Sequence, residues 1–234
     1  MKTIGILGGM SWESTKEYYR LINELTRDHF GGLKSAKMIV YSFDFEEIAR
    51  MQTEARLEEA GELLTKTAVD LERAGAEIML IATNTMHKLA DYVERAISGH
   101  FLHIADATAD KVKELGVSTV GLLGTRYTMQ QDFYRQRLEV KHGLTVLTPD
   151  SRAMDRVNEL IFAELCQGVV KDSSVVEFKE IIAALGVDGA EAMLLACTEL
   201  PMLVKQDLQK RPYILDTMQL HAEAAFKLAI AEIS

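Results

Sequence analysis

Two short motifs place a threonine and a cysteine at equivalent points of a repeated pattern. Residues 75–83 read GAEIMLIAT and residues 189–197 read GAEAMLLAC, and the two segments agree at six of nine positions. The match makes Thr83 equivalent to Cys197, each at the end of an apolar run. If a helix starts just after, its unpaired N–H groups bind a carboxylate and lower the pKa of a nearby thiol. The pattern therefore predicts two equivalent polar sites, one with a hydroxyl and one with a thiol.

The repeat extends beyond these motifs. The opening segment, TIGILGG at residues 3–9, resembles TVGLLGT at residues 119–125. A weaker third match joins Ile104-Ala105-Asp106 to Ile214-Leu215-Asp216. Buried strands share apolar residues, and that alone can produce one such match. Three matches in the same order, with Glu77 and Glu191 agreeing inside apolar runs, instead indicate two copies of one unit.

The elements around these motifs alternate between short apolar runs and amphipathic segments. Alternation of this kind is typical of βαβ units, and continuous apolar strands suit a parallel sheet covered on both faces. We therefore predict an α/β fold with two parallel-sheet domains, residues 1–105 plus 218–234 and residues 106–217. Ligands of such sheets bind beyond the carboxyl ends of the strands, where Thr83 and Cys197 lie. The expected strands are 3–9, 37–43 and 77–82, and the expected helices are 14–29, 57–74, 87–97 and 217–233.

Composition narrows the class of protein. The 234 residues include 26 basic and 35 acidic ones, giving a formal net charge of −9, and this balance argues against a nucleic-acid partner. The length allows one large domain or two small ones, and the repeat favours two. No apolar run reaches the roughly 18 residues that a membrane span needs, and the N-terminus lacks a signal-peptide pattern. Two cysteines make no disulfide framework, so we expect a cytoplasmic protein.

Four motifs carry a resemblance to a known family. TIGILGGMSWEST, TNTMH, GLLGT and LLACTELP, in this order, resemble the aspartate/glutamate racemase family from residue 3 to about residue 217. The resemblance implies a racemase that needs no cofactor, with two pseudo-symmetric α/β domains and an active site in the cleft between them. It also implies a homodimer that acts on a small amino acid. Two cysteines, one in each domain, normally exchange protons with opposite faces of the substrate α-carbon.

This sequence departs from the family pattern at one of those two positions. Cys197 matches the second family cysteine, but Thr83 occupies the place of the first. An alkanol is a far weaker acid than a thiol, whose reference pKa is about 8.5. The resemblance implies that Cys197 serves the L-face, which leaves Thr83 for the D-face. We therefore expect a racemase of aspartate or glutamate in which the proton-transfer residue on the D-face is weaker than the one on the L-face. The alternatives are a helix N-cap for Thr83 and a small buried apolar residue for Cys197; Cys166 fits a structural position on an amphipathic helix.

Further candidates surround these two residues. Asn84, Thr85 and Thr198 are expected to donate hydrogen bonds to the substrate α-carboxylate, with helix capping as the alternative. Met10 and Thr125 follow the paired glycine strands and should border the cleft. For the distal carboxylate we favour Gln52 and Gln167 by position, with Arg50 and Lys171 as the electrostatically stronger options. His87 fits a histidine whose hydrogen bonds are satisfied within the fold, with capping or orienting its loop as the alternative, and the histidine spacing does not suggest a metal site. The candidates are catalytic Thr83 and Cys197, and substrate-binding Met10, Gln52, Asn84, Thr85, Thr125, Gln167 and Thr198.

Three other functions compete with racemisation. Gly5-Ile6-Leu7-Gly8-Gly9 is reminiscent of a dinucleotide-binding turn, but it lacks the full G-x-G-x-x-G spacing and an acidic ribose partner. A decarboxylase or isomerase of a small dicarboxylic acid would need only Cys197. A two-lobed amino-acid binding protein would need neither proton-transfer residue.

Overall fold

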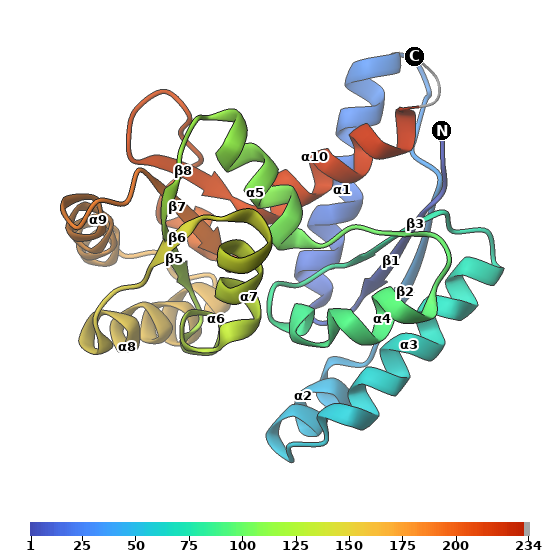
Figure 1. Ribbon diagram of the computed structural model, residues 1–234, viewed down its shortest axis with the longest axis horizontal. Helices are drawn as coiled ribbons and strands as arrows, with labels where there is room; N and C mark the ends of the chain where they lie inside the picture. Colours follow the sequence, from blue (N-terminus) through green and yellow to red (C-terminus); the bar gives the residue numbers. More distant parts are fainter. Residues whose placement is uncertain (232–234) are drawn as a thin grey trace. The chain divides into compact units, whose positions relative to one another are not determined.

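The computed structural model describes residues 1–231, and the chain divides into two compact units (Figure 1). The first unit comprises Met1–Ile104 and the segment that begins at His221, and the second comprises Ala105–Leu220. The final helix, α10 (Thr217–Ile230), therefore contributes residues to both units. Ile233, the expected end of this helix, lies outside the described residues.

The first unit is built on a parallel sheet with strand order β2-β1-β3-β4. The central strands β1 and β3 are buried at every residue, as their continuous apolar sequence predicts. The strands are β1 (Ile4–Gly8), β2 (Met38–Ser42), β3 (Ile78–Ile81) and β4 (His100–Phe101). The helices are α1 (Trp12–Phe30), α2 (Phe45–Thr53), α3 (Leu57–Arg73), the 3₁₀ turn η1 (Thr85–Leu89) and α4 (Ala90–Ala96).

The second unit has an equivalent sheet, with order β6-β5-β7-β8 and every pair parallel. This agreement in strand order confirms the predicted α/β class with two parallel-sheet domains. The strands are β5 (Thr119–Gly124), β6 (Thr145–Leu147), β7 (Ala192–Ala196) and β8 (Tyr213–Asp216). The helices and turns are α5 (Ile104–Glu114), α6 (Arg126–Gln130), α7 (Asp132–Gln136), η2 (Arg137–Lys141), α8 (Ser151–Glu159), η3 (Leu160–Glu164), η4 (Leu165–Gln167), α9 (Asp172–Val187) and η5 (Leu200–Met202).

A contact between neighbouring strands explains why the glycine and methionine motifs repeat together. Gly5 of β1 is paired in register with Met79 of β3, and Gly121 of β5 is paired with Met193 of β7. A Cβ atom on Gly5 would lie 2.8 Å from the Ala76 Cβ and 2.9 Å from the Met79 Sδ. A Cβ atom on Gly121 would lie 2.6 Å from the Met193 Sδ. In both units the methionine occupies the space that the glycine leaves open.

The repeated acidic residues have a structural task at the start of each central strand. The Glu77 carboxylate accepts a hydrogen bond of 2.9 Å from the Thr3 backbone N–H. The Glu191 carboxylate accepts one of 3.2 Å from the Ser118 backbone N–H. This backbone donor holds the pKa of Glu191 below its ordinary value. The two glutamates thus tie the beginning of one strand to the segment entering its neighbour, and the sequence repeat records this contact.

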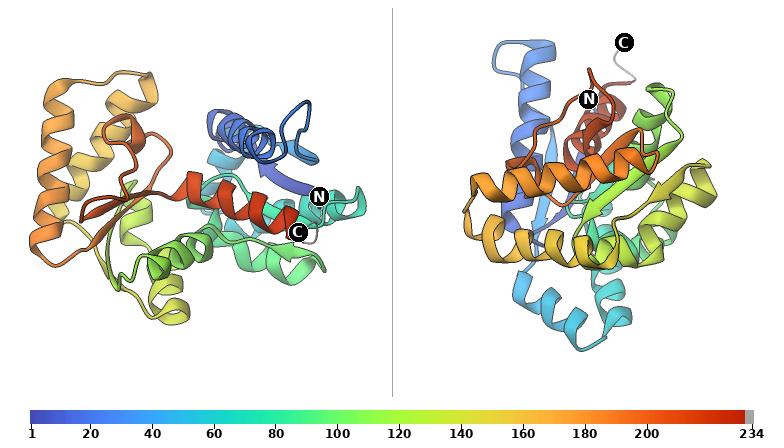
Figure 2. Two further views of the ribbon diagram at one scale, coloured as in Figure 1. Left: turned by 90° about the horizontal axis from the view of Figure 1, so that it is seen from above. Right: turned by 90° about the vertical axis from the view of Figure 1, so that its left-hand side faces the viewer.

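Two parts of the first unit differ from the sequence expectation. Helix α2 was not predicted, and the helix expected over 87–97 is divided into η1 and α4. The N-terminus of the chain lies beside the C-terminal helix, because the Lys2 backbone N–H donates a 2.8 Å hydrogen bond to the Ala229 carbonyl (Figure 2). No helix in residues 1–231 has both the length and the hydropathy that a membrane crossing requires.

The glycine contacts predict an order of destabilisation. Gly5→Ala should lower the free energy of unfolding more than Gly121→Ala, because the Ala76 Cβ is fixed to the backbone whereas the Met193 side chain can rotate. Overpacking of this kind costs about 1–3 kcal/mol. Urea unfolding followed by circular dichroism measures both variants. Ala76→Gly should reduce the cost of Gly5→Ala and leave that of Gly121→Ala unchanged; equal effects on both would contradict the assignment.

Candidate active site

Cys197 lies directly after β7, where its thiol contacts a carboxylate. Its Sγ donates a hydrogen bond of 3.0 Å to the Glu199 Oε2. The Thr198 hydroxyl donates to the same oxygen at 2.8 Å. Cys197 is only 9% exposed and belongs to the hydrophobic cluster of the second unit, whereas Thr198 and Glu199 are partly exposed. The strand end therefore holds a buried thiol against a partly hydrated carboxylate.

The surroundings of Cys197 favour the protonated thiol. Burial raises its pKa well above the ordinary value, and the negative charge and hydrogen bond of Glu199 raise it further. The backbone of Glu199 has a smaller effect in the opposite direction. A thiolate formed here is a strong base, because its conjugate acid is weak. The carboxylate is the nearby group that can accept the thiol proton.

Glu199 was missing from the predicted site residues. Its position two residues after Cys197 in CTELP is the sequence signal that points to it. In the repeat, Glu199 is equivalent to Thr85 of the first unit. The two units therefore differ at all three positions after the strand, which are Thr83-Asn84-Thr85 in the first unit and Cys197-Thr198-Glu199 in the second.

Thr83 lies at the equivalent point of the first unit, in the bend between β3 and η1. It is partly exposed. Its backbone carbonyl accepts a 2.7 Å hydrogen bond from His87 Nδ1. The N-cap of η1 is the buried Asn84, without a side-chain capping bond, so Thr83 does not occupy the capping position that the alternative interpretation gave it.

The helix starts expected after both positions are short 3₁₀ turns. Thr83 is followed by η1, and Cys197 is followed by the three-residue η5, which has Pro201 in its first turn. Proline has no backbone N–H, so η5 presents fewer donors than an α-helix start. The side chains of Thr85 and Thr198 at these turns are partly exposed.

Two of the remaining candidates in the first unit have defined contacts. The Gln52 Nε2 of α2 lies 2.5 Å from the Met86 Sδ of η1, which brings Gln52 to the turn that follows Thr83. Met10 is 4% exposed and packs in the hydrophobic cluster of this unit. Arg50 is exposed on α2. Of these residues, Gln52 is the one whose contact joins it to the Thr83 turn.

The candidates in the second unit divide between exposed and structural positions. Thr125 is the N-cap of α6, and its hydroxyl oxygen accepts a 3.3 Å hydrogen bond from the Thr128 N–H. Gln167 is exposed in η4. Lys171 forms an ion pair of 3.3 Å with Glu164, a buried carboxylate that also accepts a 2.5 Å hydrogen bond from Ser174. Lys171 therefore has a partner within the fold.

Cys166 has a different environment from the one its sequence pattern predicts. It is exposed in the 3₁₀ turn η4, which follows the π-helical turn η3, rather than lying on the inner face of a regular helix. Partial burial and, secondly, the charge of Glu199 raise its pKa. The exposed thiol thus lies within the electrostatic influence of the carboxylate that binds Cys197.

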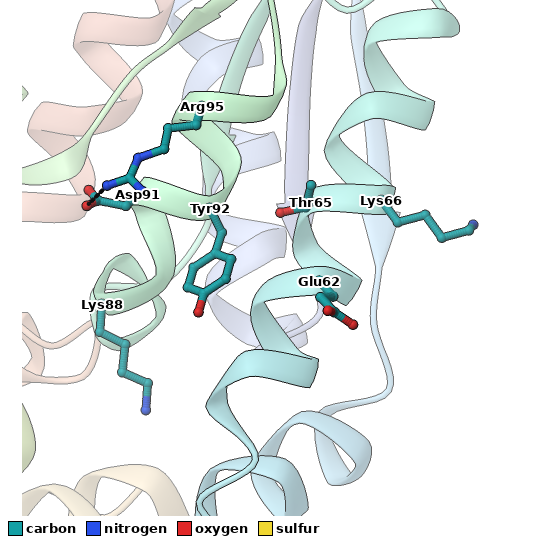
Figure 3. Close-up of a pocket in the computed structure, with 7 residues that line it drawn as sticks. All are labelled: Glu62, Thr65, Lys66, Lys88, Asp91, Tyr92 and Arg95. Carbon is teal, nitrogen blue, oxygen red and sulfur yellow. Dashed lines mark hydrogen bonds and ion pairs between the residues drawn. The ribbon is translucent and has the colours of Figure 1, made fainter.

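The surface groove in Figure 3 contains none of the predicted site residues. It lies between α3 and α4 in the first unit, with a volume of about 770 Å³. The Asp91–Arg95 ion pair, at 3.1 Å, lies on one wall. Its lining is Glu62, Thr65, Lys66, Lys88, Asp91, Tyr92 and Arg95. Elsewhere in residues 1–231, no group of three or more histidine, cysteine, aspartate or glutamate residues has an arrangement that could hold a metal ion.

Comparison with known proteins assigns the family. The family described as Asp/Glu/hydantoin racemase matches this chain over residues 7–225. The structure is similar to that of a proposed Asp/Glu racemase from Yersinia pestis, with 45% identity, a TM-score of 0.93 and coverage of 98% of this chain and 100% of the other. It is also similar to an aspartate racemase homologue from Pyrococcus horikoshii, with 36% identity, a TM-score of 0.87 and coverage of 98% and 99%.

A curated relative adds a sequence match. The broad specificity amino-acid racemase RacX of Bacillus subtilis is 27% identical over 163 residues, which are 68% of this chain and 70% of that protein. The match to the family covers the end of β1, all of the other strands, and both strand ends that carry Thr83 and Cys197. The chain therefore belongs to the Asp/Glu/hydantoin racemase family.

Proposed function

We propose that this protein racemises aspartate or glutamate, with Cys197 exchanging the α-proton on the L-face and Thr83 on the D-face. The observation that carries the proposal is the hydrogen bond from the Cys197 thiol to Glu199, at the strand end equivalent to that of Thr83. Family membership supports an amino-acid racemase. The choice of an acidic substrate is supported by the structural relatives whose names refer to Asp/Glu and aspartate racemases.

The L-face step begins with the thiol–carboxylate pair. The thiol proton moves to the Glu199 Oε2, which leaves a thiolate at Cys197. The thiolate then takes the α-proton of the L-amino acid, and the electron pair of the broken C–H bond stays on the substrate as a carbanion. Hydrogen-bond donors aimed at the substrate α-carboxylate stabilise this charge; we assign that role to Asn84, Thr85 and Thr198.

The proton-transfer step on the D-face uses a group of weaker acid–base strength than the Cys197 thiol. The Thr83 hydroxyl donates its proton to the carbanion, which forms the D-enantiomer. Thr83 then regains a proton from water and Glu199 releases its proton to water, which restores both groups. In the reverse direction Thr83 must act as a base, and an alkanol is a poor one. The residue equivalent to Glu199 is Thr85, so this side also lacks a carboxylate acceptor. Gln52, near the Thr83 turn, and Gln167 are proposed to bind the distal carboxylate.

The asymmetry predicts different saturated rates for the two enantiomers. At saturating substrate the initial rate should be about tenfold or more higher with L-aspartate or L-glutamate than with the D-enantiomer, because a thiolate is the better base. Thr83→Cys should bring the two rates closer together by raising the D-rate. Chiral chromatography of both reaction directions measures this. A Thr83→Ser control keeps a hydroxyl and should preserve the asymmetry; equal wild-type rates would count against it.

Isotope exchange tests the role of Cys197 directly. In D₂O, wild-type protein should introduce deuterium at the α-carbon of the L-substrate, whereas Cys197→Ser should reduce this exchange by roughly 10²–10⁴-fold, the usual contribution of a general base. Cys166→Ser is the matched control and should retain exchange. Full exchange by Cys197→Ser would refute the assignment. Saturable amino-acid binding by wild-type protein without exchange would instead identify a binding protein.

Contact between Cys197 and Glu199 predicts that one substitution has two opposite effects, faster alkylation of the thiol and slower exchange of the substrate α-proton. Glu199→Gln removes a charge that raises the pKa of Cys197, so alkylation of this thiol by iodoacetamide should become faster by about tenfold for each pKa unit lost. Exchange on the L-face should nevertheless fall by roughly 10²-fold, because the proton acceptor is gone. Both measurements belong in a Cys166→Ser background, since Cys166 is exposed. Unchanged exchange would show that Glu199 does not accept the thiol proton.

A further inference from the structure

His87 links the carbonyl of Thr83 to a distant segment of the first unit. Its Nδ1 lies 2.7 Å from the Thr83 carbonyl oxygen. Its Nε2 lies 3.2 Å from the backbone nitrogen of Ile104. The side chain is 3% exposed; its hydrogen bond with Ile104 is buried, and the one with Thr83 is partly buried. One imidazole ring thus connects the bend after β3 to the first residue of α5.

The two partners determine the protonation of this ring. A carbonyl oxygen only accepts, so Nδ1 must carry a proton. A backbone N–H only donates, so Nε2 must present its lone pair. Both bonds form together only with the neutral Nδ1–H tautomer. A neutral ring of fixed orientation is therefore built into this position.

A second histidine fixes the same distant segment from another direction. The His221 Nε2 donates to the Leu102 carbonyl at 2.9 Å, and its Nδ1 accepts from the Tyr18 hydroxyl at 2.8 Å. The rings of His87 and His221 have centroids 5.7 Å apart. Hydrogen bonds thus hold the chain at Leu102 and again at Ile104. His87 is consequently hydrogen-bonded to a segment that His221 also holds.

We propose that His87 is a positioning residue for Thr83: it fixes the Thr83 peptide through its Nδ1–H and so holds the hydroxyl in place for the D-face proton transfer. This inference rests on the proposed function. The direction of the Thr83 carbonyl sets the backbone dihedral ψ of that residue and constrains the chain on which its Cα–Cβ bond is built. Losing the donor frees this peptide, and a catalytic group displaced by about 1 Å loses much of its rate.

The proposal predicts an effect on one face only. The hydrogen bonds described for the Cys197 thiol involve Glu199, and those of Glu199 involve Thr198, all in the second unit. His87 takes part in none of them. Removing its donor should leave proton abstraction from the L-substrate intact and impair only the delivery of a proton from the Thr83 side.

Two substitutions separate the two bonds of the ring. His87→Asn keeps an amide N–H near the place of Nδ1, and His87→Gln keeps an amide oxygen near the place of Nε2. L-aspartate in D₂O reports both faces at once, because the carbanion returns either to deuterated L-aspartate or to D-aspartate. His87→Gln should lower the ratio of D-product to deuterated L-substrate about tenfold, whereas total exchange stays within about threefold. His87→Asn should keep the wild-type ratio.

The outcomes distinguish this proposal from the proposed function. Two outcomes would show that His87 has no positioning role, provided that Thr83→Ala lowers the ratio of D-product to deuterated L-substrate. In the first, His87→Gln and His87→Asn have the same effect on this ratio. In the second, both variants lower total exchange and the ratio equally. If Thr83→Ala leaves the ratio unchanged and Cys197→Ser leaves exchange unchanged, the proposed function itself fails. Wild-type protein with ¹⁵N-labelled histidine gives a test that needs no variant: His87 should be neutral with its proton on Nδ1. The Nε2–H tautomer would overturn the proposal.

Discussion

Burial of the central strands on both faces is the constraint on which the rest of the structure depends. β1, β3 and β7 are buried at every residue, and β5 is buried at all but its first. A strand covered on both sides has no room for a polar side chain along its length. Polar chemistry is thereby confined to the point where each strand ends. Thr83 and Cys197 occupy this point after β3 and β7, and the same constraint keeps the Cys197 thiol largely away from water.

Because of the same constraint, the fold could be predicted from the sequence. Apolar runs predicted β1, β2 and β3, and the agreement of two nine-residue motifs predicted two equivalent sheets. The repeated glycine, methionine and glutamate residues have local causes, since the Gly5–Met79 and Gly121–Met193 contacts join neighbouring strands. The helical turns were less predictable. The π-helical turns η2 and η3 and the separation of η1 from α4 have no periodic signal that distinguishes them from ordinary helix.

The residues of the candidate site differ in whether the sequence alone predicts them. Residues that follow a strand end could be predicted, because position alone indicates them. Partners that depend on the folded chain could not. Lys171 is an alternative cation for the distal carboxylate, and its ion pair with the buried Glu164 depends on the folded chain. His87 owes its fixed tautomer to the backbone N–H of Ile104, which no local pattern connects to it. Glu199 was close in sequence, but its importance comes from the Cys197 hydrogen bond.

The inequality between Thr83 and the Cys197–Glu199 pair has a kinetic consequence that the chemistry of either side does not reveal. The enantiomers of an amino acid have equal free energies in water, so the Haldane relation requires kcat/KM to be the same in both directions. A protein that turns over the L-enantiomer faster at saturation must therefore have the higher KM for it. In a racemase of this kind, whatever advantage the thiol gives to one direction disappears when substrate is scarce, and at such concentrations the two enantiomers are racemised at equal initial rates.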